Sequence, residues 1–408
     1  MREIFTSIDI GTDEVKVVTA EYYNEKYNIL ASAEVKSKGI RQGLIINPND
    51  AASCIKKAIK SVESKLGTRI DKVIAVVPSN NIFITVSEAK IDIDTDLITG
   101  SDIYSVMSHS IKGKVESSME VIDVMPIEYK IDGKKVANPL GLEGKKLELK
   151  CVVIAVPKKN VYSVVTTLKA LNIEVMDITI SSLADYAATK AKEIDSKVVS
   201  LVDIGEEKTA VSIFNKGILI KDTIIPIGSN IIDEAISFSY KIDNEASKKV
   251  KEEFAVANRK YADSDEVYEI KNRLEKPITI NQYRLSELIE NKSIEMLKNI
   301  KNEINNLTNK EIGYIIITGG MTSMTGFSAI VEQLFMRNAT VMNFSIIGIR
   351  NNKYSSCYGA IKYFVEKLEL REKEYSMFDE QKISEMLSTR KSFGKDNVLS
   401  KIFGKLFD

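Results

Sequence analysis

The strongest constraint on the fold of this chain is a strand–turn–strand pattern that occurs twice. An apolar strand over 5–10 ends in Asp9-Ile10-Gly11 and leads through a tight turn into another strand. About 190 positions later, an apolar strand over 198–203 runs into Asp203-Ile204-Gly205 and again into a turn and a strand. Apolar runs of this length bounded by glycine turns predict buried strands. Their recurrence in the same order indicates a fold that is duplicated within the chain.

The sequence around these hairpins alternates between strand and helix patterns. After the first hairpin, the pattern predicts a strand over 27–35, a helix over 50–66 and a strand over 73–77 that ends at Pro78. Late in the chain it predicts a long helix over 285–307, a strand over 312–317, and helices over 327–334 and 357–368. This alternation is typical of an α/β protein.

The stretch from Phe83 to Asn172 interrupts the first half. It predicts a helix over 102–111, strands over 122–131 and 147–156, and a helix over 161–171. We therefore expect a small α+β insertion with a core of its own, of the kind that exposed loops tolerate.

Composition excludes several classes of protein. The 408 residues carry 57 Lys and Arg against 57 Asp and Glu, so no net field attracts nucleic acid, and we expect no nucleic-acid partner. Cys54, Cys151 and Cys357 are too far apart for a disulfide framework or a paired zinc site. The N-terminal residues lack an export signal, and no run reaches the ~18 apolar residues of a spanning helix.

The turns of both hairpins have the composition of phosphate-binding loops. At the first, Gly11 and Thr12 can expose backbone N–H groups to phosphate oxygens, and Asp9 can hold a hydrated Mg²⁺. A plain β-turn remains the alternative. The second copy places Asp203 and Gly205 in the equivalent positions, and two facing loops can hold a phosphate chain between them. A third motif, a buried strand that ends in Thr318-Gly319-Gly320-Met321, allows a flat ring to approach a backbone without Cβ atoms, although a strand-to-helix turn explains it equally well.

In this order, the three motifs resemble the phosphate-1, phosphate-2 and adenosine motifs of the actin, hexokinase and heat-shock-chaperone superfamily. Within it, the segments 8–16 and 39–43 and the insertion after Pro78 resemble the FtsA family of cell-division proteins. The resemblance implies an α/β, actin-like (ribonuclease H-like) duplicated fold, with an inserted α+β subdomain 1C in place of subdomain 1B of actin. It also implies that ATP with Mg²⁺ binds in the cleft. The nucleotide contacts that it implies fall on Asp9, Gly11, Thr12, Asp13, Lys16, Asp203, Gly205, Lys208, Thr209, Gly319, Gly320 and Met321, with Asp9 and Asp203 holding Mg²⁺ through water.

The same resemblance divides the chain into subdomains. We expect subdomain 1A over 1–82 and 173–196, 1C over 83–172, 2A over 197–234 and 309–368, 2B over 235–308, a flexible linker over 369–391 and a C-terminal helix over 392–408.

Three features depart from the family pattern. Glu206 and Glu207 occupy positions that are usually glycine, where carboxylates repel phosphates unless they point outward or Lys208 offsets them. Ser247 and Val250 stand where an adenosine-contacting helix usually offers Glu and Lys. We expect ATP to bind, because the three motifs are present. We expect its hydrolysis to be weak or absent, because no hydrolytic base can be identified.

Three other functions remain open. A PilM-type pilus-assembly ATPase shares the resemblance through subdomain 1C. A sugar or acetate kinase requires a catalytic carboxylate and an acceptor pocket, which the sequence does not identify. A degenerate actin-fold scaffold would bind membrane and partner without nucleotide.

The C-terminus predicts a membrane-binding helix over 396–407. With about 100° of rotation per residue, its apolar residues form one continuous arc and its lysines lie on the polar face. The apolar residues are Val398, Leu399, Ile402, Phe403, Leu406 and Phe407, and the lysines are Lys401 and Lys405. This predicts a peripheral membrane protein, and the family resemblance implies that it lies on the cytoplasmic face of the inner membrane, at the division site.

The resemblance also implies partners. A filament of identical chains on the membrane, the C-terminal tail of FtsZ and later divisome proteins are expected. The FtsZ tail is acidic, so Lys292, on the charged helix of subdomain 2B, is our candidate contact. Charged residues on an exposed helix face more often serve only to keep that face solvated.

Overall fold

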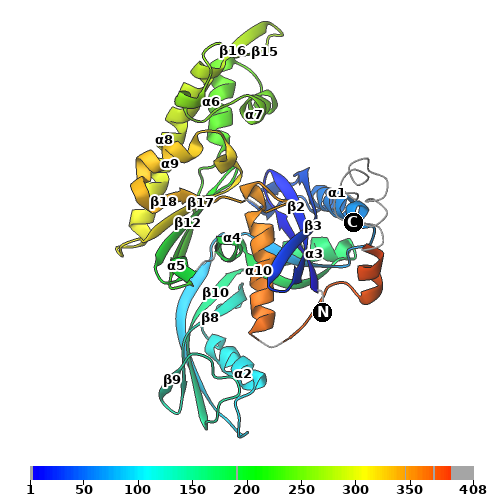
Figure 1. The fold of residues 1–408 in the computed structure, drawn as a ribbon, viewed down its shortest axis with the longest axis vertical. Coiled ribbons are helices and arrows are strands. Elements are labelled where there is room, and N and C mark those ends of the chain that lie inside the picture. The colour runs from blue at the N-terminus through cyan, green and yellow to red at the C-terminus, as the bar shows by residue number, and fades with distance from the viewer. Residues whose placement is uncertain (1–2, 190–191, 345, 371–372, 387–408) are drawn as a thin grey trace, which may run out of the picture.

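Two five-stranded mixed sheets of identical topology form the framework of the computed structural model, which describes residues 3–189, 192–344, 346–370 and 373–386 (Figure 1). The first sheet has the order β3-β2-β1-β6-β11. Its strands are β1 (Glu3–Ile10), β2 (Glu14–Tyr23), β3 (Lys26–Lys36), β6 (Lys72–Val77) and β11 (Glu174–Ile180). The second has the order β14-β13-β12-β17-β18. Its strands are β12 (Val198–Ile204), β13 (Thr209–Asn215), β14 (Ile218–Ile225), β17 (Tyr314–Thr318) and β18 (Ala339–Val341).

The strand pairing confirms the internal duplication. In each sheet, the strand that carries the Asp-Ile-Gly motif runs antiparallel to the next strand and parallel to a later one. Asp9 pairs with Val76 of β6, and Asp203 pairs with Thr318 of β17. Both aspartates therefore lie at the carboxyl end of a central strand, where ligands of α/β sheets bind.

Helices cover both sheets, and local sequence sets several of their ends. Helix α1 begins after Asn47, whose side chain accepts hydrogen bonds from the N–H groups of Asn49 and Asp50, and it stops at the left-handed Gly67. The helices are α1 (Pro48–Leu66), α2 (Gly100–Ile111), α3 (Lys158–Ala170), α4 (Ser181–Thr189), α5 (Lys192–Asp195), α6 (Asn230–Tyr240), α7 (Asn244–Glu253), α8 (Gln282–Leu307), α9 (Phe327–Phe335) and α10 (Ser355–Glu369). Two short hairpins complete these layers: β4 (Ile40–Arg41) with β5 (Leu44–Ile45), and β15 (Val267–Lys271) with β16 (Pro277–Asn281).

Helices α4 and α10 lie between the two sheets at the centre of the molecule (Figure 1). A Cβ on Gly359 of α10 would lie 1.7 Å from the carbonyl oxygen of Ala184 in α4, so the helices touch backbone to backbone. Tyr186 of α4 stacks on Phe214 of β13 with 3.9 Å between ring centroids. The helix pair therefore joins the two halves through buried contacts.

The insertion forms a separate sheet with the order β7-β10-β8-β9, and it projects from the rest of the chain (Figure 1). Its strands are β7 (Phe83–Asp92), β8 (Met119–Ile131), β9 (Lys134–Val136) and β10 (Lys146–Pro157). Helix α2 packs against it and contributes Val106 to a small core with Leu147 and Leu149. Together with the two duplicated sheets, this bears out the expected actin-like α/β fold with an α+β insertion.

Helix α3 packs differently from our expectation. We placed it within the insertion 83–172, but Val161, Val164 and Leu168 are buried in the core of the first sheet, against α1, β6 and β11. The packing places the end of the insertion near Pro157 rather than at Asn172. Helical periodicity shows that α3 has an apolar face, but it cannot show which core that face joins.

The segment after α10 is also corrected by the structure. We expected a flexible linker over 369–391, but Met377, Phe378 and Met386 are buried in the first core. The N–H of Met377 donates to the carbonyl of Ile4 at 3.0 Å, which attaches the segment to β1. Apolar side chains without a helical repeat can still fill a groove, so aperiodicity did not indicate exposure here. The predicted C-terminal helix over 392–408 lies outside the described residues.

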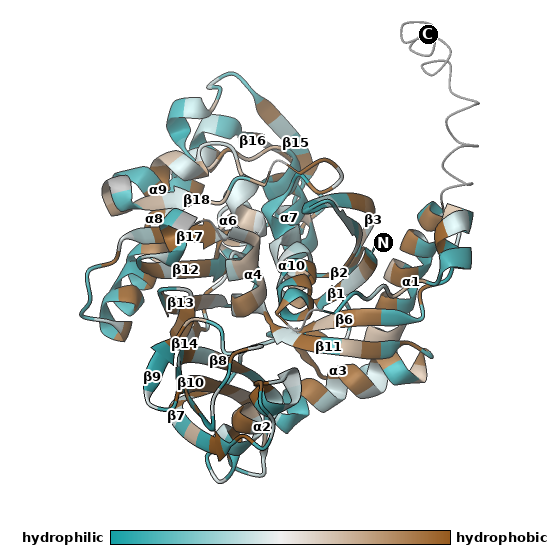
Figure 2. Cartoon of the chain, turned by 60° about the horizontal axis from the view of Figure 1, so that its bottom comes forward, coloured by the Kyte–Doolittle hydropathy of each residue, from teal (hydrophilic) through white to brown (hydrophobic). Residues whose placement is uncertain are grey.

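Apolar residues follow the strands of both sheets and the inner faces of the helices, whereas the outer helix faces are polar (Figure 2). Within the described parts of the chain, no helix combines the length and apolar composition that crossing a bilayer requires.

A buried carboxylate connects the two halves near the start of the insertion. Asp222 of β14 accepts hydrogen bonds from Ser79, after β6, and from Ser212 of β13, both at 3.0 Å. Burial raises the pKa of Asp222 to about 6, although the hydrogen bonds from these hydroxyls oppose the rise. The folded chain therefore keeps this proton up to a higher pH than the unfolded chain does.

This difference predicts a pH-dependent stability. The free energy of unfolding should fall by about 3 kcal/mol as the pH rises from about 4 to about 6, because only the unfolded carboxylate ionises freely there. Asp222→Asn should lose this pH dependence. The free energy of unfolding of the variant should therefore rise relative to that of the parent between pH 4 and pH 7. Urea unfolding at several pH values measures it, with the exposed Asp96→Asn as control. Parallel pH profiles for parent and Asp222→Asn would contradict the assignment.

Candidate functional site

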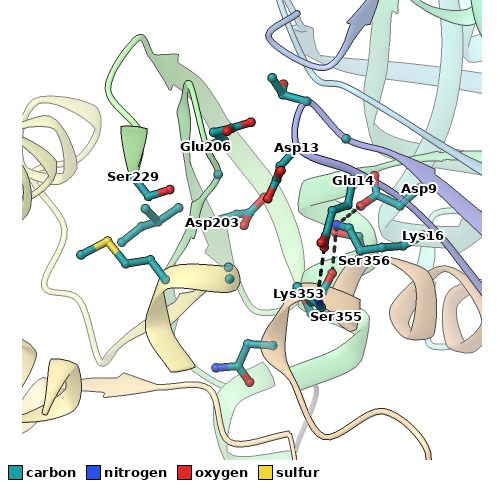
Figure 3. A pocket seen from close by; sticks show the side chains of 18 of the residues that line it. Asp9, Asp13, Glu14, Lys16, Asp203, Glu206, Ser229, Lys353, Ser355 and Ser356 are labelled. Carbon is teal, nitrogen blue, oxygen red and sulfur yellow. Dashed lines mark hydrogen bonds and ion pairs between the residues drawn. The ribbon is translucent and has the colours of Figure 1, made fainter. Parts of the chain in front are cut away.

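A cavity of about 570 Å³ lies between the two halves, at the carboxyl ends of β1, β12 and β17 (Figure 3). Eleven of the twelve residues that we predicted for nucleotide contact line it. They are Asp9, Gly11, Thr12, Asp13, Lys16, Asp203, Gly205, Lys208, Gly319, Gly320 and Met321. Thr209 is the exception, because it is buried in β13 and its hydroxyl donates to the carbonyl of Ile227 at 2.7 Å. Three motifs that are far apart in the sequence therefore meet at one cavity.

The two hairpin turns have the same local geometry. The N–H of Gly11 donates to the carbonyl of Glu14 at 3.1 Å, and the N–H of Gly205 donates to the carbonyl of Lys208 at 2.9 Å. A Cβ would lie 2.9 Å from the acceptor oxygen in the first turn and 3.0 Å in the second. A side chain would therefore crowd the backbone acceptor in each turn, which favours glycine, and both glycines line the cavity.

Lys16 is the buried cation of the first turn. Its ammonium lies 2.7 Å from Asp9 Oδ2 and donates to the carbonyl of Lys353 at 3.0 Å (Figure 3). Burial lowers the pKa of Lys16, but the charge and hydrogen bond of Asp9, together with the charges of other nearby groups such as Asp203, outweigh this effect, and the pKa lies above its ordinary value. The cavity therefore contains a permanently charged lysine at its first turn.

Asp203 is half-buried at the end of β12, as Asp9 is at the end of β1. Burial raises the pKa of the Asp203 carboxyl, and nearby Lys16 opposes this rise. Bringing a cation close to Asp203 would favour its ionised form.

Sequence reasoning missed a fully buried aspartate near the cavity. Asp185 of α4 accepts hydrogen bonds from Ser355 at 2.6 Å and Ser356 at 2.8 Å, two residues that line the cavity. Burial raises the pKa of Asp185 above its usual range. Its position among the buried residues Leu183, Ala184, Tyr186 and Ala187 of the same helix was the available signal.

The two glutamates of the second turn have different partners. Glu207 turns away from the cavity and accepts the N–H of Gln42 at 2.8 Å. Glu206 lines the cavity and pairs with Lys248 at 2.7 Å. Lys208, which we considered as the offsetting charge, donates instead to Asn80 Oδ1 at 2.7 Å, and burial lowers its pKa to about 8.

The residues of helix α7 that face the cavity differ from those we expected. Ser247 and Val250 are fully buried in the helix packing, whereas Lys248 and Lys251 line the cavity. Lys251 forms an ion pair with Asp233 at 2.6 Å. The sequence located this helix, but tertiary packing determines which of its faces is turned toward the cavity.

The remaining predicted residues lie elsewhere. Lys292 is a partly exposed residue of α8 that pairs with Glu295 at 2.8 Å. The predicted membrane residues between Val398 and Phe407 lie outside the described residues. Among the described residues, no three His, Cys, Asp or Glu side chains converge as a metal site.

Comparison of the coordinates with solved structures identifies the architecture. The PilM–PilN type IV pilus biogenesis complex contains a chain that superposes with a TM-score of 0.59 at 14% identity, covering 88% of this chain and 98% of that one. MreB5 of Spiroplasma citri bound to ADP superposes with a TM-score of 0.53 at 12% identity, covering 89% of this chain and 98% of that one. At these identities the similarity establishes an actin-like fold and nothing finer.

Sequence comparisons identify the family. The family model for cell division protein FtsA matches residues 200–359, and the model for the SHS2 domain inserted in FtsA matches residues 79–155. Cell division protein FtsA of Bacillus subtilis (strain 168) is 26% identical over 369 residues, covering 88% of this chain and 83% of that protein. FtsA of Borreliella burgdorferi is also 26% identical, covering 89% of this chain and 91% of that protein. The two family models and the relatives that span nearly the whole chain agree, and this chain belongs to the FtsA family of cell-division proteins.

Proposed function

We propose that this chain binds ATP between its two halves and tethers FtsZ filaments of the cell-division ring to the cytoplasmic face of the inner membrane. One observation carries the nucleotide part of the proposal. Both glycine turns and the Gly319-Gly320 turn line the same cavity, so a phosphate chain can lie between the turns while the adenosine meets a backbone without Cβ atoms.

The donor set of the cavity fits Mg²⁺ bound mainly through water. Asp9 and Asp203 supply carboxylates at the ends of β1 and β12, and Mg²⁺ prefers one or two carboxylates together with waters and phosphate oxygens. Bound Mg²⁺ would neutralise charge on the phosphates. Lys16 holds Asp9 in place through its ion pair.

Hydrolysis is proposed to be weak or absent. The two carboxylates at the strand ends have other proposed roles: Asp9 pairs with Lys16, and Asp9 and Asp203 are the proposed holders of Mg²⁺. A general base requires a carboxylate that is free to accept a proton from water. ATP would then act chiefly as a ligand that stabilises one arrangement of the two halves.

Isothermal titration of the purified chain with ATP and Mg²⁺ tests this proposal directly. We expect saturable binding that weakens when Mg²⁺ is withheld. An absence of binding would leave the degenerate actin-fold scaffold as the better description. The PilM-type alternative finds support only in the fold, whereas the sequence relatives that span this chain are FtsA proteins.

We also propose self-assembly through the projecting insertion and recruitment of later divisome proteins. The insertion sheet ends in the exposed strand β7, with Val86 more than half exposed. Unpaired strand edges are ready templates for association. Electron microscopy of the chain on lipid would reveal such filaments.

The contact with the FtsZ tail is proposed to include Lys292 of α8. Lys292→Glu should weaken binding of an acidic FtsZ-tail peptide by about three- to tenfold at low salt, because it reverses a charge at the rim of the contact. Fluorescence anisotropy at several salt concentrations measures both the affinity and its salt dependence.

The matched control for this prediction is Lys310→Glu, which makes the same change of charge at an exposed position after α8. Equal affinities for parent and Lys292→Glu at low salt would argue that Lys292 serves only solvation and its pair with Glu295.

A further inference from the structure

Lys248 crosses the mouth of the cavity and joins carboxylates from both halves of the chain. Its ammonium lies 2.5 Å from Asp13 Oδ1 and 2.7 Å from Glu206 Oε1. Asp13 belongs to the turn between β1 and β2, and Glu206 belongs to the turn between β12 and β13. These are the two turns that face each other across the cavity in Figure 3.

All three groups are charged and partly shielded from water. The side chain of Lys248 is 22% exposed, and those of Asp13 and Glu206 are 31% and 23% exposed. Burial lowers the pKa of Lys248, but hydrogen bonds from its ammonium to both carboxylates raise it above its ordinary value. Partial burial makes this bridge stronger than a surface ion pair, because water screens it less.

Weaker contacts beside the bridge also connect the halves. Lys36 of β3 pairs with Glu252 of α7 at 3.6 Å, and Gln42 donates its N–H to Glu207 at 2.8 Å. Lys248 has the shortest of these contacts and reaches both phosphate-facing turns at once. It is therefore the central contact in the closure of the cavity mouth.

We propose that Lys248 is an electrostatic latch that holds the two turns together, and that it moves from Asp13 and Glu206 to phosphate oxygens when a nucleoside polyphosphate enters. The exchange step rests on the proposed ATP binding, whereas the link between the two turns does not.

Charge complementarity explains why the exchange needs phosphates. Without Lys248, Glu206 would repel an entering phosphate chain, and among the described residues only Lys36, at 3.2 Å, would offset the charge of Asp13. The ammonium has three donors on a flexible stem, so it can rotate toward phosphate oxygens and still remain near one carboxylate. A nucleoside without phosphates offers no charge to replace the carboxylates, so the latch favours polyphosphate ligands.

The latch is tested by measuring the distance between the two halves of the chain in the absence of added nucleotide. Spin labels are attached to cysteines introduced by Lys60→Cys in α1 and Lys276→Cys beside β16, both exposed positions, while the three native cysteines are buried. Electron–electron double resonance should give one narrow distance for the parent and a longer or broader distribution for Lys248→Met. Lys249→Met removes an exposed lysine from the same helix and should behave as the parent. An unchanged distribution in Lys248→Met overturns the latch.

The exchange is tested by titration with ATP and Mg²⁺. Lys248→Met should weaken ATP binding about tenfold or more, because it removes a charge-assisted contact, whereas Glu206→Gln should strengthen it several-fold by releasing Lys248. Adenosine affinity should change in neither variant. If Lys248→Met binds ATP as the parent does, or if Glu206→Gln binds it more weakly, the exchange is overturned. If the parent itself binds no ATP, the proposed function and the exchange fail together, and the distance measurement still decides the closure.

Discussion

Gly320→Phe is expected to abolish ATP binding without unfolding the protein. Gly320 lines the cavity, and a Cβ built on it meets nothing closer than Lys353 Cβ at 3.9 Å. A larger side chain at this cavity-lining position is expected to occupy the place proposed for the adenosine. We expect the affinity to fall at least about a hundredfold, or about 2.7 kcal/mol, as measured by isothermal titration.

The neighbouring glycine shows why Gly320 is the better probe. Gly319 has φ +104°, and a Cβ there would lie 2.2 Å from the carbonyl oxygen of Ile204, so its replacement disrupts the backbone itself. Gly100→Phe is the matched control, because Gly100 starts α2 in the insertion and a Cβ there meets nothing within 4 Å. Circular dichroism should show all three proteins folded. Parent-like ATP affinity in Gly320→Phe would place the nucleotide elsewhere.

Phe403→Glu is expected to release the chain from anionic vesicles. Phe403 lies within the apolar arc predicted for the C-terminal helix, so the change places a carboxylate where acyl chains should lie. The same carboxylate is repelled by anionic headgroups, which Lys401 and Lys405 are expected to attract. Co-sedimentation should show the bound fraction falling several-fold.

Attachment is expected to depend on assembly as well as on this helix. A single short helix is unstable in water and binds a bilayer only marginally, so many copies in a filament would hold together by avidity. Ser400→Gln changes the polar side of the same helix and should pellet as the parent does. If Phe403→Glu pellets equally well, another part of the chain is the anchor.

The sequence alone was sufficient for the features that depend on neighbours along the chain. Glycine is favoured where a Cβ would crowd the carbonyl three residues ahead, as at Gly11 and Gly205, and the repeat of this turn indicated the duplication. Apolar runs located the central strands, because a buried strand must be apolar on both faces. The family resemblance then linked these turns and Gly319-Gly320 to one site, and the structure brings them together.

Tertiary structure decided the features that depend on distant parts of the chain. Helix α3 joined the first core rather than the insertion, and residues 373–386 docked beside β1, because a matching apolar surface was available there. The rotation of α7 placed Lys248 rather than Ser247 at the cavity, and only this rotation paired Glu206 with a cation. Sequence spacing constrains which residues share a helix face, but the packing of that helix against others determines which face meets the site.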